Sequence, residues 1–209
     1  MFSLVIAGVL GYLLGSFPTA YLLVRWKSNI DIRNSGSGNV GTLNSYIVTK
    51  SKLIGGGVLV LDLLKGLIVV LIVRGMSDGV FAPQGVAGVA AVVGHSFPVW
   101  LKFKGGRGLA TAAGVLLALS WVVVLIWCMF WFVGFKLSKA VNVGNMIACL
   151  LTLVVILVSS AFALERVIPT EASTGEFRYF AVVLLGILLS RHIDPAREFL
   201  KKRGVKEQG

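Results

Sequence analysis

The chain has 209 residues, of which 56% are hydrophobic and only 14% charged, and its formal net charge is +11. These values exclude a soluble globular domain, because a fold of this size could not hide so much apolar surface from water. Hydrocarbon can solvate that surface if each spanning segment satisfies its own backbone hydrogen bonds, which for long apolar runs means helices. We therefore predict an all-α, polytopic transmembrane helix bundle that forms a single domain over residues 1–209.

Long apolar runs predict the membrane spans in chain order. The runs cover residues 3–24, 54–73, 80–99, 108–135, 141–164 and 177–190. Five of them have the length of single spans. The run 108–135 is long for one crossing, which needs roughly 20 residues, and short for two. Its interpretation depends on the placement of charge.

Basic residues near span ends are held on the cytoplasmic side of a membrane. If 108–135 crosses once, the basic C-terminal tail lies opposite the basic loops 25–53 and 101–107, against this rule. If it forms two short helices that turn near Ser120, those loops, residues 136–140 and the tail share one face. Four of the twenty Lys and Arg residues then lie elsewhere, namely Lys65, Arg74, Arg166 and Arg178. We predict seven spans, with the N-terminus outside and the C-terminus in the cytoplasm.

A glycine-rich loop follows the first span, with the sequence NSGSGNVGTLN over residues 34–44. Its glycines let the backbone take positive φ and approach a ligand closely, and its Ser, Thr and Asn side chains supply compact hydrogen-bonding groups. A flexible linker has a similar composition. Because a second such loop lies on the same predicted face, we favour a site that cradles an oxyanion.

The second loop has the sequence GHSFPVWLKFKGGRG over residues 94–108 and leads into an apolar helix. Backbone N–H groups at a helix start, combined with Lys and Arg side chains, suit a phosphate group. The loop is not a Walker A motif, since GxxxxGK[ST] is absent. The alternative is that Lys102, Lys104 and Arg107 only fix the topology and bind lipid headgroups.

Two further features carry chemistry. His95 and His192 are the only histidines, and both are predicted at the same membrane depth, which favours a functional role. Asp62 and Lys65 lie three residues apart inside the second span, where charges must be paired or face a polar cavity. They form either a structural ion pair or support for the site. The patterns HxxxxD, HExxH and GxSxG and a Cys/His zinc cluster are absent, so we expect no metal and no cofactor.

Together, GSGNVGTLN, GHSFPVWLKFKGGRGLATAAG and the late histidine resemble the PlsY family of acyl-phosphate:glycerol-3-phosphate acyltransferases over nearly the whole chain. The resemblance implies a multi-pass enzyme of the bacterial cytoplasmic (inner) membrane, with its active site on the cytoplasmic face. Such enzymes transfer a fatty acyl group from acyl phosphate to the 1-hydroxyl of glycerol 3-phosphate and form lysophosphatidic acid. The implied partners are these two substrates and membrane phospholipids, without nucleic acid.

The resemblance also implies a set of site residues. Those expected to take part in catalysis are Ser37, Asn39, Thr42, Lys104 and His192. Those expected to bind the substrates are Gly38, Gly41, Asn44, His95, Lys102, Gly105, Gly106, Arg107, Gly108 and Asn142. We hypothesise that Lys104, Arg107 and the backbone of the two glycines between them hold the donor phosphate. Either His192 or a phosphate oxygen of the substrate then takes the hydroxyl proton.

The chain departs from the family pattern mainly where the family holds the acceptor. Ile47 replaces an Arg, Pro195 and Arg197 replace Asn residues, Asn142 replaces a Ser, and Arg107 replaces a Lys. Two alternatives follow, namely a paralogue that uses another phosphorylated polyol, and a non-catalytic protein that binds phospholipid or acyl phosphate. A small transporter is a third alternative, for which more intramembrane polar residues are expected.

Overall fold

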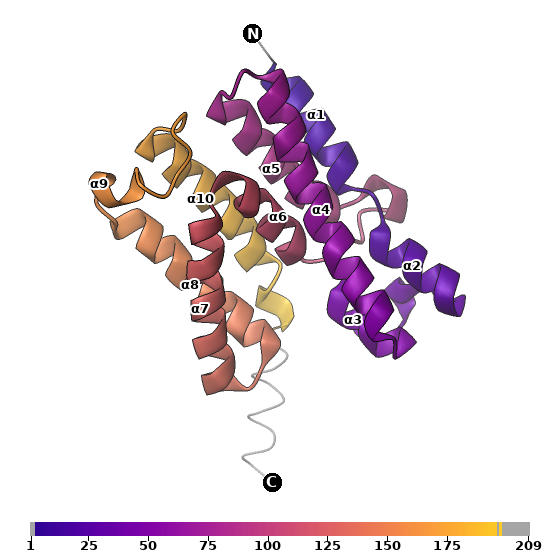
Figure 1. Cartoon of the computed structure of the whole chain (residues 1–209). Coiled ribbons are helices and arrows are strands. Elements are labelled where there is room, and N and C mark those ends of the chain that lie inside the picture. Colours follow the sequence, from indigo (N-terminus) through magenta and orange to yellow (C-terminus); the bar gives the residue numbers. More distant parts are fainter. Residues whose placement is uncertain (1–2, 196, 198–209) are drawn as a thin grey trace. The chain divides into compact units, whose positions relative to one another are not determined.

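The computed structural model describes residues 3–195 and 197, and all regular secondary structure in this part of the chain is helical (Figure 1). The helices are α1 (Leu4–Gly15), α2 (Thr19–Ser28), η1 (Ile32–Asn34), α3 (Thr42–Thr49), α4 (Lys52–Met76), α5 (Phe81–Ser96), η2 (Val99–Leu101), α6 (Leu109–Leu119), α7 (Trp121–Ser138), α8 (Val141–Val158), α9 (Ala161–Leu164) and α10 (Thr174–Ser190). The helices up to Leu119 form one compact unit, and those from Ser120 onward form a second. Most of the predicted basic C-terminal tail lies outside the described residues.

Several helical segments are long and apolar enough to cross a membrane. Among the described residues there are five, namely Leu4–Ser28, Lys52–Met76, Phe81–Leu101, Trp121–Ser138 and Val141–Val158. The helices α6, with 11 residues, and α10, with 17, are shorter. The predicted all-α class is confirmed, and the count of seven spans stays a prediction.

Two of the apolar runs are interrupted within the helical structure. The run 108–135 breaks where we expected, because α6 ends at Leu119, Ser120 is extended with φ −160° and ψ 93°, and α7 follows. The Ser120 hydroxyl donates to the Val167 carbonyl at 2.5 Å. The first run also breaks, which we did not predict. Pro18 lacks an N–H and restricts the residue before it, so α1 ends before it and α2 starts after it.

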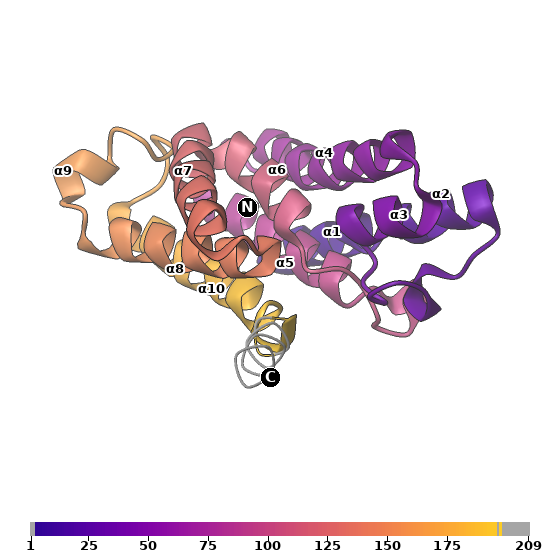
Figure 2. The ribbon, with the colours of Figure 1, turned by 90° about the horizontal axis from the view of Figure 1, so that it is seen from below.

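Close backbone contacts hold the first unit together. A Cβ atom added at Gly11 of α1 would overlap the carbonyl oxygen of Ala87 in α5, and one added at Gly66 of α4 would overlap that of Thr111 in α6. Figures 1 and 2 show α1 beside α5 and α4 beside α6. Small residues that let helix backbones touch are typical of membrane bundles, where lipid removes the hydrophobic drive for association.

The second unit is built on α8, which packs against both α7 and α10. Gly134 and Gly144 meet at the α7/α8 contact, where a Cβ at Gly134 would lie 3.2 Å from the Gly144 Cα. Helix α10 begins with a capping box formed by Ser173 and Glu176. The Arg178 guanidinium donates to the Ser159 carbonyl at 2.5 Å, which satisfies an acceptor at the end of α8.

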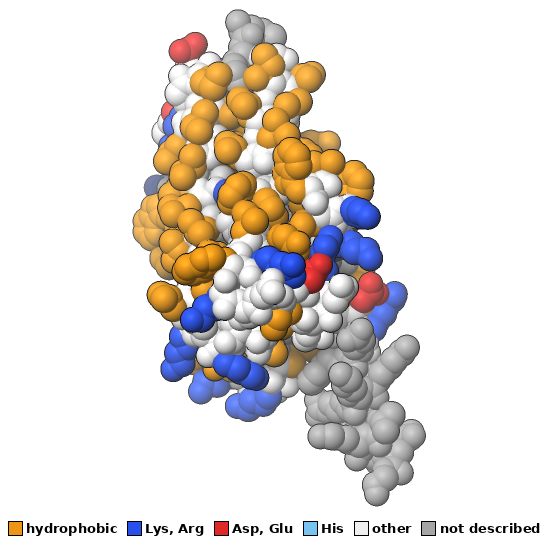
Figure 3. Space-filling view, turned by 90° about the vertical axis from the view of Figure 1, so that its right-hand side faces the viewer, with side chains coloured by type: hydrophobic (Ala, Val, Ile, Leu, Met, Phe, Trp, Pro, Cys, Tyr) orange, Lys and Arg blue, Asp and Glu red, His pale blue; other side chains and the backbone are white. Residues whose placement is uncertain are grey.

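Large hydrophobic side chains point outward over much of the molecule. Leu53 is 84% exposed and Val158 76% exposed. On the face shown in Figure 3, hydrophobic side chains cover the upper part, and Lys and Arg side chains gather toward the lower part. Exposed apolar surface of this extent is unfavourable in water and favourable in hydrocarbon. The basic zone therefore marks a region suited to a membrane boundary.

Candidate active site

Asn44 organises the first glycine-rich loop from the first turn of α3. Its side chain is only 1% exposed, and its Oδ1 accepts a hydrogen bond from the Ser37 N–H at 2.9 Å. Its Nδ2 donates to the carbonyls of Ser35 and Asn39, both at 3.0 Å, and to that of Ile32 at 3.4 Å. Asn44 was predicted to bind substrate, and here its amide group folds the loop that carries Ser37 and Asn39.

Two glycines of this loop have left-handed backbone geometry. Gly36 has φ +62° and Gly38 has φ +70°, a region that residues with a Cβ rarely adopt. A Cβ at Gly36 would also overlap the Asn44 Oδ1. The loop leaves Ser37 exposed and Asn39 half-buried, and it ends at Gly41, the N-cap residue of α3. Thr42, the first residue of α3, is half-buried beside them.

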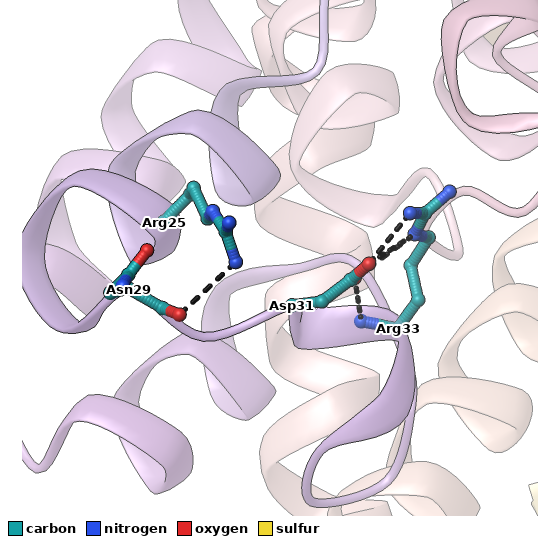
Figure 4. A network of polar contacts seen from close by, with 4 residues as sticks. All are labelled: Arg25, Asn29, Asp31 and Arg33. Carbon is teal, nitrogen blue, oxygen red and sulfur yellow. Dashed lines mark hydrogen bonds and ion pairs between the residues drawn. The ribbon is translucent and has the colours of Figure 1, made fainter.

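An ion pair braces the start of the same loop (Figure 4). Asp31 accepts two hydrogen bonds from the Arg33 Nε and one from its Nη2, the latter at 2.6 Å. The hydrogen-bonded Arg33 side chain lowers the pKa of Asp31 to about 2, and Asp31 in turn raises the pKa of Arg33. Arg33 also lies over the Tyr21 ring at 5.2 Å, and Arg25 donates to the Asn29 carbonyl. The loop is therefore fixed at its start by the Asp31–Arg33 pair and at its end by the Asn44 side chain.

The second loop folds back onto the end of α5. The Gly105 N–H donates to the Ser96 carbonyl at 3.2 Å, and the Gly106 N–H donates to the His95 carbonyl at 3.1 Å. These two amides thus satisfy α5, whereas our hypothesis had them holding the donor phosphate. Gly108, with φ +85°, leads into α6, whose first N–H groups have no partner within the helix by geometry. Those N–H groups are better placed for an anion than the ones of Gly105 and Gly106.

The cations predicted for this site flank the turn. Lys102 and Lys104 are exposed, and Arg107 is half-buried just before α6. Lys102 and Phe103 both have positive φ, 54° and 62°, which is uncommon for residues with a Cβ. The N–H groups of Phe103 and Lys104 donate to the carbonyls of Pro98 and Leu101 and keep the turn in this conformation.

The two loops meet at Gly106. A Cβ at Gly106 would lie 2.6 Å from the Val40 carbonyl oxygen and would overlap the His95 ring at Nε2. A small, partly open cavity lies beside this junction. Its lining includes Thr19, Val40, Lys65, His95 and Gly105. Residues of both motifs therefore line one space, close to a buried charge.

That buried charge is Asp62 of α4, which is 1% exposed. Its Oδ1 lies 2.9 Å from the Lys65 Nζ and 3.6 Å from the His95 Nδ1, and it accepts a hydrogen bond from the Thr19 hydroxyl. We did not predict Thr19 as part of the site. Its position directly after Pro18, where a helix must restart, was the available signal.

In the second unit, His192 is fully buried at the end of α10. Its Nδ1 lies 2.7 Å from the Leu188 carbonyl oxygen, and because a carbonyl only accepts, Nδ1 is the donor. Its Nε2 lies 3.3 Å from the Asn145 Nδ2 and can accept from that amide. Asn142 is half-buried in the first turn of α8. Asn145, one turn further along the same face, was missed although its polarity in an apolar run was a signal.

Within residues 3–195 and 197, no three His, Cys, Asp or Glu side chains come together as metal ligands would. Two glycine-lined loops do meet, at the ends of apolar helices. The second of these loops carries Lys and Arg side chains and leads into the start of α6. These features define a class of protein, a helical membrane protein whose glycine-lined loops suit an anionic ligand.

The profile of the glycerol-3-phosphate acyltransferase family matches residues 5–202, and the chain belongs to this family. A glycerol-3-phosphate acyltransferase of Thermotoga petrophila is 40% identical over 142 residues, which cover 67% of this chain and 70% of the relative. One of Pseudomonas paraeruginosa is 44% identical over 147 residues, which cover 69% of this chain and 76% of the relative.

Solved structures of the family are similar over almost the whole chain. A crystal structure of PlsY, an integral membrane glycerol 3-phosphate acyltransferase, in its glycerol 3-phosphate form has a TM-score of 0.79 and 31% identity. Its lysophosphatidic acid form has a TM-score of 0.76 and 30% identity. Both matches cover 97% of this chain and 94% of the PlsY chain.

Proposed function

We propose that this protein acylates glycerol 3-phosphate in a bacterial cytoplasmic membrane, in the synthesis of phospholipids. As a member of its family it is a membrane acyltransferase, and the fatty acyl group comes from acyl phosphate. The products are lysophosphatidic acid and phosphate. The observation that carries the proposal is the contact between Val40 of the first motif and Gly106 of the second beside one cavity. Two glycine-lined loops at one cavity, the second of which carries Lys and Arg, suit phosphate-bearing substrates.

The proposed topology has seven spans, with α6 and α10 as crossings in addition to the five longer segments. The N-terminus is outside, and the C-terminus and the active site are on the cytoplasmic side. Exposed lysines at helix ends and loops of the first unit, including Lys27, Lys50, Lys52 and Lys102, support this orientation through the positive-inside rule. We propose that residues 1–209 make one acyltransferase domain, as the family resemblance implies.

The chemistry requires positioning more than reactive side chains, because acyl phosphate is already activated. Lys104, Arg107 and the first N–H groups of α6 hold the donor phosphate and stabilise it as it leaves. Ser37, Asn39 and Thr42 line the reacting centre. The acceptor hydroxyl oxygen attacks the acyl carbon, the bond from that carbon to the phosphate oxygen breaks, and phosphate departs with the electron pair.

The hydroxyl proton passes either to a phosphate oxygen of the substrate or to His192. The hydrogen bond from the His192 Nδ1 to the Leu188 carbonyl supports the second route, since it leaves Nε2 as the basic nitrogen of the neutral ring. The remaining proposed binding residues act through backbone geometry or charge, and they are Gly38, Gly41, Asn44, His95, Lys102, Gly105, Gly106, Gly108 and Asn142.

The test is an assay of the purified protein with acyl phosphate and glycerol 3-phosphate, in which lysophosphatidic acid is quantified by mass spectrometry. We expect product from the wild type and a loss of about 10²- to 10³-fold in kcat/KM for Lys104→Ala, because a cation that stabilises the leaving phosphate is removed. Lys52→Ala, at another exposed lysine, is the matched control and should retain activity. Equal turnover by wild type and Lys104→Ala would refute the donor site, and absence of product from the wild type would refute the activity.

A second candidate function is the acylation of a different phosphorylated polyol. Ile47 favours it, because this α3 residue is 42% exposed and apolar where the family has an Arg that would bind an anion.

A panel of phosphorylated polyols distinguishes the two functions by their kcat/KM values. We expect Ile47→Arg to lower the KM for glycerol 3-phosphate. If glycerol 3-phosphate is by far the best acceptor of the wild type, this second candidate is excluded. If no polyol is acylated but a non-hydrolysable acyl phosphonate binds, the protein is a binder.

A further inference from the structure

A single carboxylate oxygen joins three helices of the first unit. The Asp62 Oδ1 in α4 contacts the Lys65 Nζ at 2.9 Å, the His95 Nδ1 of α5 at 3.6 Å and the Thr19 hydroxyl at the start of α2. Lys65 also donates to the Phe17 carbonyl at 3.3 Å, in the break between α1 and α2. The residues Thr19, Asp62 and His95 are buried, and Lys65 is half-buried.

The cluster contains more polar residues than are needed to neutralise the Asp62 charge. Asp62 lies ten residues, about 15 Å, along α4 from its first residue, where an unpaired charge would be costly. Lys65 by itself neutralises it, and a buried ion pair contributes little net stability. Thr19 and His95 add no balancing charge that the pair requires. Their common effect is to fix the orientation of the carboxylate and of the His95 ring.

The His95 ring transmits that orientation to the second loop. Its Nδ1 edge faces Asp62, and its Nε2 edge lies against Gly106, where there is no room for a Cβ. The His95 carbonyl also accepts the Gly106 N–H. Gly106 in turn touches the Val40 carbonyl of the first loop. Contacts therefore run without interruption from Asp62 through His95 to the junction of the two loops.

We propose that Asp62 is a positioning residue for the donor site: it holds the His95 ring against Gly106 and so sets the position of the turn that carries Lys104 and Arg107. The proposal rests on the proposed function, whose donor phosphate binds at this turn. Asp62 itself touches no substrate. Its removal lets the ring and the turn shift together, which weakens the donor site and leaves the acceptor site unchanged.

The experiment compares Asp62→Asn with the charge-balanced double variant Asp62→Asn/Lys65→Met. The double variant keeps the experiment decisive if the single variant does not fold, because it leaves no unpaired ammonium in the membrane. The KM values for acyl phosphate and glycerol 3-phosphate are measured separately. We expect each variant that folds to raise the donor KM by about tenfold or more and to leave the acceptor KM unchanged. If the double variant recovers wild-type constants, Asp62 serves only to neutralise Lys65 and the proposal fails.

Coupling to His95 is tested in the same proteins. In a double-mutant cycle, Asp62→Asn should add little to the defect of His95→Gln, because both act through one ring. The chain has two histidines, so NMR of labelled imidazoles is readily assigned with a His192→Asn reference. Asp62→Asn should shift the His95 ring signals and leave those of His192 in place. If the His95 signals do not shift, the positioning proposal is overturned, whether or not the wild type transfers an acyl group. If the signals shift but the wild type is inactive, only the proposed function is refuted.

Discussion

The two regions that carry the proposed chemistry are built differently. In the first unit, both loops are held by contacts to the backbone: the Asn44 side chain bonds to four backbone groups of residues 32–39, and Gly105 and Gly106 pack where no side chain fits. In the second unit, His192 is held by the Leu188 carbonyl and Asn145. Beyond it, Asp194 and Arg197 form an exposed ion pair at 3.7 Å.

This difference indicates which part of the site tolerates change. A region shaped by backbone packing cannot accept a new side chain without moving, whereas one shaped by a few side chains can change ligand by substitution. The departures from the family pattern at Ile47, Pro195 and Arg197 avoid the packed loops, and Arg107, which replaces a Lys inside the second loop, keeps the positive charge. The comparison therefore predicts a donor site that resists variation and an acceptor site that allows it.

Among the changes that test this comparison, the largest effect is expected for Gly105→Ala. A Cβ there would overlap the His95 carbonyl oxygen and the Pro98 ring, so the turn must move as a whole. We expect a loss of activity of about 100-fold or more, measured as lysophosphatidic acid formation. Gly56→Ala is the matched control, since this glycine of α4 has open space around it and alanine favours helix. Near-normal activity of Gly105→Ala would show that the donor region is not fixed by packing.

An intermediate effect is expected for Asn145→Ala, which removes the partner of the His192 Nε2. Because the ring keeps its bond to Leu188, we expect kcat to fall by about tenfold while the KM for acyl phosphate stays constant. Thr152→Val serves as the control, because Thr152 lies on the same helix and its hydroxyl has no hydrogen-bond partner in the described part of the chain. An unchanged kcat for Asn145→Ala would exclude Asn145 from the site.

The structure also shows how far the sequence could anticipate this arrangement. The break at Ser120 was predictable because charge placement constrains the whole chain, and the glycine loops were visible as motifs. The direction of the Gly105 and Gly106 N–H groups was not, because their acceptors at the end of α5 are set only when the turn folds back. The same holds for Thr19, which meets Asp62 from a distant part of the chain.

The smallest expected effect concerns pH and the brace at the start of the first loop. The folded-state pKa of Asp31, lowered to about 2 by Arg33, lies below its ordinary value of 3.8. The pair therefore stabilises the fold fully above the ordinary pKa, and this contribution is lost as the pH falls from about 4 through about 2. The melting temperature of wild type should exceed that of Asp31→Asn by a small, constant amount above pH 5, and the difference should shrink below about pH 4 and vanish below about pH 2. A difference that is undiminished at pH 2 would contradict the assignment.

The most direct measurement is a structure of the protein with a non-hydrolysable acyl phosphonate. The phosphonate should lie between the 36–44 and 104–108 segments, within hydrogen-bonding distance of the Lys104 Nζ and the first N–H groups of α6, and Lys104→Ala should bind the analogue far more weakly. A phosphonate bound away from both loops, or equal affinity of wild type and Lys104→Ala, would contradict the claim that these loops form the donor site.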